Sequence, residues 1–104
     1  MNEKQFGIDV VITLATGKLY ANPIKVNEAL SHILGYEVTT VEIPYIMNIA
    51  KEHVLASYPQ FANIEPSFEI KSWEDVNKFM EEQAAIHGSL FNLSTLANTT
   101  KKTK

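Results

Sequence analysis

A turn after the first apolar run holds the residues that come closest to a known chemical motif. Thr16-Gly17-Lys18 places a Gly-Lys pair directly after that run, as the phosphate-binding P-loop does. The P-loop also needs a glycine where this chain has Ile12, and a serine or threonine where it has Leu19. Without the glycines the backbone cannot wrap a phosphate. The segment therefore predicts a tight turn between two strands.

The other side chains that can do chemistry are scattered along the chain. His32, His53 and His87 fall on three different expected helices, without the H-x-H or H-E-x-x-H spacing of a zinc site. The absence of cysteine excludes a thiolate nucleophile, a disulfide and a cysteine-ligated metal. No serine stands in a G-x-S-x-G context. These patterns predict no catalytic residue, no metal ligand and no cofactor, and hence a protein that is not an enzyme.

The charge distribution disfavours a nucleic-acid partner. Nine lysines and twelve acidic residues give a net charge of -3, and the chain has no arginine. Three of the lysines stand among the last four residues, so the rest of the chain carries about -6. Arginine is the side chain that best matches phosphates and guanine edges. We therefore do not expect this chain to bind DNA or RNA.

Length and composition predict one domain of ordinary globular type. The chain has 104 residues, of which 45% are hydrophobic and 20% charged. The uncharged apolar stretch nearest the start, 10–15, is far shorter than a signal-peptide core or a membrane span. We expect a single domain over 1–97, a disordered basic tail over 98–104, no membrane partner and a cytoplasmic location.

Runs rich in β-branched residues predict the strands. The clearest is 6–14, and 19–21 can return after the turn as a short second strand. A third run, 37–43, ends at a proline, and 67–71 can add a short edge strand. These runs predict a small antiparallel sheet of about three strands.

Three amphipathic runs predict the helices. The first, 22–35, opens with an asparagine cap and a proline at the first helical position, and ends in glycine. The second, 45–57, stops before a proline. The third, 72–88, opens with a serine and, three residues later, an aspartate, which is similar to a capping box. The expected fold class is therefore α+β, a small antiparallel sheet covered by three helices.

Short motifs in this chain resemble a small family of phage and prophage proteins of unknown function. The run from Ile12 to Tyr20 is similar to the family's T-T-G-R-L-L opening, and the similarity continues through 40–44, 58–61 and 73–88. The chain departs from the family's T-H-Q-L-P-R pattern at Val41 and Tyr45, where the family has histidine and arginine. The resemblance covers about 12 to 96. It implies an origin in a bacteriophage or prophage and no particular activity.

The turn and the matched motifs name six contact residues for a ligand or partner: Thr16, Gly17, Lys18, Tyr20, Thr40 and Tyr45. We expect a non-enzymatic binding protein that acts in the bacterial host cytoplasm on a host factor, such as a defence or regulatory protein. The alternative is a binder of a small ligand or nucleotide signal, with the 16–18 turn and nearby tyrosines as its pocket; an enzyme ranks third. We also expect pairing into a homodimer, because an exposed edge strand and a small core both gain from it.

Overall fold

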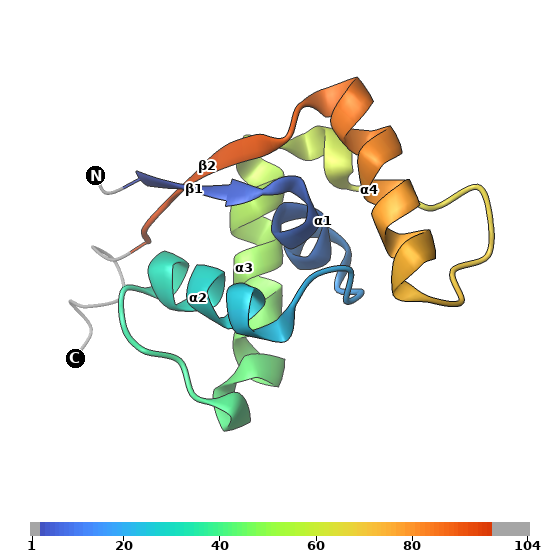
Figure 1. The fold of residues 1–104 in the computed structure, drawn as a ribbon. Coiled ribbons are helices and arrows are strands. Elements are labelled where there is room, and N and C mark those ends of the chain that lie inside the picture. Colours follow the sequence, from blue (N-terminus) through green and yellow to red (C-terminus); the bar gives the residue numbers. More distant parts are fainter. Residues whose placement is uncertain (1–2, 97–104) are drawn as a thin grey trace.

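The computed structural model describes residues 3–96, which form four α-helices and a two-stranded antiparallel sheet (Figure 1). The elements are β1 (Glu3–Gly7), α1 (Ile8–Thr16), α2 (Pro23–Leu34), the 3-10 turn η1 (Thr40–Glu42), α3 (Ile43–Ser57), the 3-10 turn η2 (Pro59–Phe61), α4 (Trp73–His87) and β2 (Leu90–Ser94). The α+β class is confirmed, but with four helices instead of three and without the third strand. The predicted tail, 98–104, lies outside the described residues.

The largest correction concerns the segment 6–14, which the sequence predicts as one strand. The strand ends at Gly7, and α1 begins at Ile8. Apart from Asp9, every residue from Ile8 to Ala15 is buried. A helix buried on all sides lacks an amphipathic period, so its sequence looks the same as that of a buried strand. Figure 1 shows α1 in the middle of the molecule, where it contacts α2, α3 and α4.

Threonine hydroxyls and a glycine shape the end of α1. Thr13 Oγ1 and Thr16 Oγ1 each donate to the backbone carbonyl four residues earlier, both at 2.8 Å. Gly17 ends the helix with φ of 80°, in the left-handed region that favours glycine. The Tyr20 N–H donates to Thr13 Oγ1 at 2.9 Å. These bonds hold 19–21 as a loop on α1, so the predicted turn between two strands is wrong.

The segment 37–43, the third predicted strand, is a loop followed by a helical turn. The Glu42 carboxylate accepts a hydrogen bond from the Thr39 N–H at 3.0 Å, as part of a capping box. This box starts η1, which leads directly into α3 at Ile43. A capped helical start outweighs the modest β propensity of valine and threonine. The predicted edge strand at 67–71 is also irregular.

The observed sheet joins the two ends of the described chain. β1 pairs with β2 in an antiparallel register that sets Phe6 opposite Phe91 and Lys4 opposite Leu93. In β2, Phe91 and Leu93 are buried and the residues between and before them are exposed, so one side of the strand packs onto the body.

The three predicted amphipathic helices are confirmed as α2, α3 and α4. The Asn22 side chain accepts from the Ile24 N–H at 2.8 Å, and Gly35 ends α2 with φ of 84°. Helix α3 begins two residues earlier than predicted and ends at Ser57 as expected.

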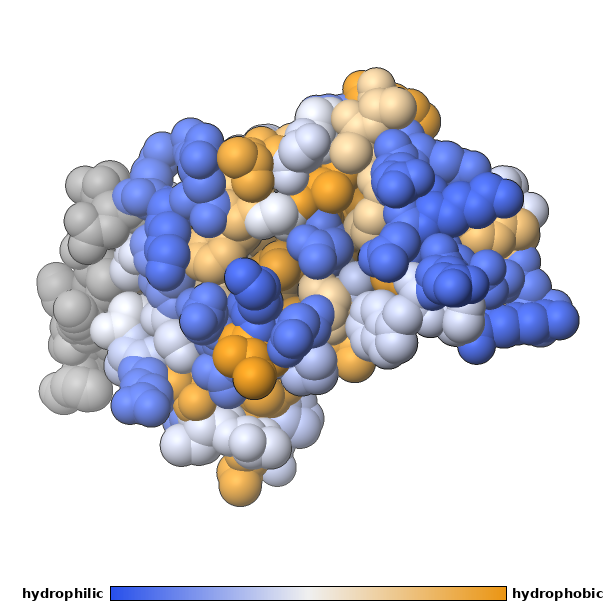
Figure 2. Space-filling model, in the orientation of Figure 1, coloured by the Kyte–Doolittle hydropathy of each residue, from blue (hydrophilic) through white to orange (hydrophobic). Residues whose placement is uncertain are grey.

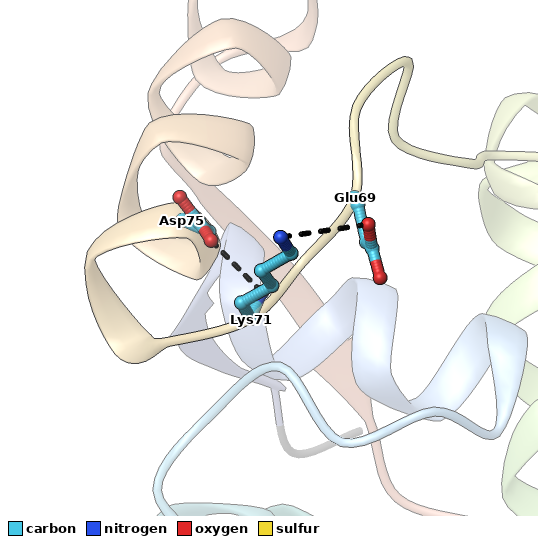
Figure 3. A network of polar contacts seen from close by, with 3 residues as sticks. All are labelled: Glu69, Lys71 and Asp75. Carbon is cyan, nitrogen blue, oxygen red and sulfur yellow. Dashed lines mark hydrogen bonds and ion pairs between the residues drawn. The ribbon is translucent and has the colours of Figure 1, made fainter.

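A short polar network fixes the start of α4 (Figure 3). Ser72 caps the helix, and its side chain accepts from the Asp75 N–H. The Asp75 carboxylate accepts from the Lys71 N–H at 2.8 Å, and the Lys71 ammonium lies 3.8 Å from Glu69. The Asp75 carboxylate thus accepts from the N–H of the residue before the cap, whereas in the predicted capping box it would accept from the N–H of the cap itself. The network sets the position of Trp73, the first residue of α4.

Candidate functional site

The predicted contact residues do not share one pocket. Thr16 and Lys18 line a hollow of about 140 Å³, Gly17 lines one of about 300 Å³, Thr40 one of about 440 Å³ and Tyr20 one of about 580 Å³. Tyr45 is 78% exposed on α3. Two of these hollows, those of Gly17 and Thr40, share Pro23 and Ile43 and so lie side by side. A binding role for any of the six stays a prediction.

A cleft of about 580 Å³ lies where the β1–α1 junction, the loop before α2 and helix α4 meet. Its volume is in the range of small-molecule sites. Apolar side chains make part of its wall: Ile8, Tyr20, Ala21, Pro23, Trp73 and Met80. Polar side chains also reach it: Asp9, Asn22, Asn77 and Ser89. A mixed lining of this kind can hold a ligand with an apolar body and one or two polar groups.

Asp9 supplies the charge in this cleft. Its half-buried carboxylate accepts a hydrogen bond from the Val10 N–H at 2.8 Å, at the start of α1. Within residues 3–96 it has no ion-pair partner, and it is the one ionisable carboxylate in the lining. A Cβ on Gly7 would lie 2.7 Å from Asp9 Oδ1, so the glycine leaves the room that the carboxylate occupies.

Trp73 lies at the cleft with 55% of its surface exposed. Asn77 and Met80 follow it at helical spacings of four and seven residues, so one side of α4 forms this wall. The Tyr20 ring, which also lines the cleft, stands edge-on to Phe79 of α4 at 5.2 Å, so the loop before α2 packs against the same helix.

The charge of the cleft does not suit a nucleotide. Among residues 3–96 no lysine lines it, and the chain has no arginine. Phosphate groups are bound by such cations or by glycine-rich backbone. A single carboxylate instead attracts cations.

The histidines serve the fold in the part of the chain that the structure describes. His32 Nε2 lies 2.7 Å from the Leu93 carbonyl and His53 Nε2 lies 2.8 Å from the Ser94 carbonyl, so both hold β2. His87 stands edge-on to Phe61 at 5.0 Å. Between residues 3 and 96, no three histidine or acidic side chains come together as a metal-binding group.

A second surface feature is a group of exposed apolar residues on the loop before α2, on α2, on η1 and on α3, called the apolar face below. Leu19 and Ile24 line the two adjoining grooves, and Val41, Tyr45 and Ile49 are exposed on η1 and α3. Val41, Tyr45 and Ile49 are spaced four residues apart and therefore follow one side of η1 and α3. In Figure 2, hydrophobic surface is visible over the first half of α2 and at the lower tip of the molecule, where η1 lies.

Comparisons of this chain with family models, with curated proteins and with solved structures give no match. The phage-family resemblance therefore stays a prediction. Over residues 3–96, none of the helices is long and apolar enough to cross a membrane.

Proposed function

We propose that this chain is a non-enzymatic binding protein, encoded by a phage or prophage, that acts on a protein of the bacterial host. The observation that carries the proposal is the apolar face. Exposed residues there include Ile24 at 70%, Val41 at 76% and Tyr45 at 78%. Large apolar residues exposed on neighbouring elements of a small domain commonly mark a site of protein contact.

The shape of the apolar face favours a protein partner over a small molecule. Its residues come from the loop before α2, from α2, from η1 and from α3, and two of them, Leu19 and Ile24, line adjoining grooves. A partner that covers all of them must span several elements, which suits a protein surface. Tyrosine and large aliphatic residues also make up the centres of many protein interfaces.

A host protein is the partner that the sequence resemblance supports. The resemblance implies an origin in a phage or prophage, and the chain shows no constellation of catalytic side chains among its motifs. Binding to a defence or regulatory protein needs a surface, and the apolar face provides one.

The test has two stages. The immobilised chain is incubated with lysate of a candidate host, the retained protein is identified and purified, and its affinity is measured by calorimetry. Ile24→Ser on the apolar face is compared with Ile86→Ser on α4, because the two isoleucines are 70% and 69% exposed. We expect Ile24→Ser to weaken binding about tenfold, a loss of about 1.4 kcal/mol, and Ile86→Ser to leave it unchanged.

Two results would contradict the proposal. One is that no host protein is retained under mild conditions. The other is a purified partner that binds wild type and Ile24→Ser equally well.

A further inference from the structure

The cleft between the β1–α1 junction and α4 combines a carboxylate with an exposed indole. We infer that this cleft binds a small amine, with the cationic nitrogen at the Asp9 carboxylate and Trp73 and an apolar body against the neighbouring side chains. The inference goes beyond the proposed function because it requires no protein partner. The cleft shares only Pro23 with the grooves of the apolar face.

The charge of the lining selects a cation. Asp9 is half-buried, so its interaction with a bound charge is less screened than that of a surface carboxylate. Within the described range, no lysine lines the cleft to neutralise it. The acidic excess of the chain outside its last residues adds a field that attracts cations and repels anions.

The indole adds a second source of cation recognition. Tryptophan is the aromatic side chain that attracts ammonium groups most strongly over its face. Trp73 is more than half exposed, although an aromatic side chain of this size usually gains by burial. Ile8, Tyr20 and Met80 line the same cleft and offer apolar contact to the rest of the ligand.

Gly7 leaves room for the Asp9 carboxylate in the cleft. The glycine has φ of -67° and ψ of 157°, values that any residue adopts, so its backbone does not require glycine. Its missing side chain matters because a Cβ there would lie 2.7 Å from Asp9 Oδ1. Alanine at this position must therefore move the carboxylate while the backbone can stay in place.

The single tryptophan makes binding directly observable. Three probes of similar shape are titrated while Trp73 fluorescence is recorded: phenethylamine, the neutral 2-phenylethanol and the anionic 3-phenylpropionate. We expect a saturable change with phenethylamine and none with the other two. The inference is overturned if phenethylamine causes no saturable change up to its solubility, or if the neutral or anionic probe binds equally well.

Variants locate the site. Asp9→Asn keeps the acceptor for the Val10 N–H and removes the charge, so we expect phenethylamine affinity to fall at least about tenfold. Gly7→Ala should lower it in the same direction by displacing the carboxylate. Glu82→Gln removes the same charge from an exposed position outside the cleft and should bind like wild type.

Circular dichroism melts confirm that each variant is folded before it is titrated. Wild-type affinity in Asp9→Asn would overturn the inference. Equal losses in Asp9→Asn and Glu82→Gln would overturn it too, because they would show attraction to the overall charge instead of a site.

Discussion

The hydroxyl of Thr13 carries two hydrogen bonds inside the core, and its removal tests how the loop after α1 is held. Thr13 is 2% exposed; its Oγ1 donates to the Asp9 carbonyl and accepts from the Tyr20 N–H. Thr13→Val keeps the shape of the side chain and leaves the Tyr20 N–H without its partner. A buried donor that loses its acceptor costs about 1–3 kcal/mol.

We therefore expect Thr13→Val to lower the free energy of unfolding by about 2 kcal/mol. For a domain of this size that corresponds to a decrease in Tm of about 8–16 °C. The assay is urea denaturation followed by circular dichroism, together with hydrogen exchange of the Tyr20 amide, which should become faster.

Thr16→Val is the matched control on the same helix. Thr16 Oγ1 makes the same kind of bond to the carbonyl four residues earlier, but the residue is half-buried and the Lys18 N–H that it accepts from is exposed. Water can replace that partner, so the expected loss is only about 0.5 kcal/mol. Equal stability of Thr13→Val and wild type, with unchanged exchange at Tyr20, would refute the reasoning.

Three further predictions follow from other parts of the structure. Tyr58→Phe removes the hydroxyl that donates to the Asn92 carbonyl at 2.8 Å and keeps the ring against Phe91. This bond is exposed, so water can replace it and unfolding should become easier by only about 0.5 kcal/mol; β2 amides that exchange no faster would count against this role. Gly17 has φ of 80° and open space around it, so Gly17→Ala adds backbone strain and no steric clash. It should lower the free energy of unfolding by about 1 kcal/mol in chemical denaturation, and an unchanged midpoint would contradict this. The homodimer predicted from sequence should give a dimer mass in light scattering, and a monomer mass at all concentrations would exclude it. The two copies would pair through β1, because Tyr58 and His53 already bond carbonyls of β2.

Asp9 and Trp73 show why the candidate cleft could not be predicted from sequence. One stands just after β1 and the other begins α4, with more than sixty positions between them. Each is unremarkable in its local context: an acidic residue beside an apolar run, and an aromatic residue in the first turn of a helix. They line one cleft only because α1 and α4 pack together.

Local sequence patterns are enough to predict α2, α3 and α4. Their signals are local, because a cap such as Asn22 or Ser72 bonds within three residues and an amphipathic stripe repeats within one helix. The composition likewise set the acidic charge and the lack of arginine.

The helical conformation of the segment after Gly7 and the pairing of β1 with β2 depend on tertiary contacts. The apolar run of α1 suits a buried strand or a buried helix equally well in sequence, and the choice depends on the helices that surround it. The strand partners stand at opposite ends of the described chain, so their register depends on contacts that no local window contains.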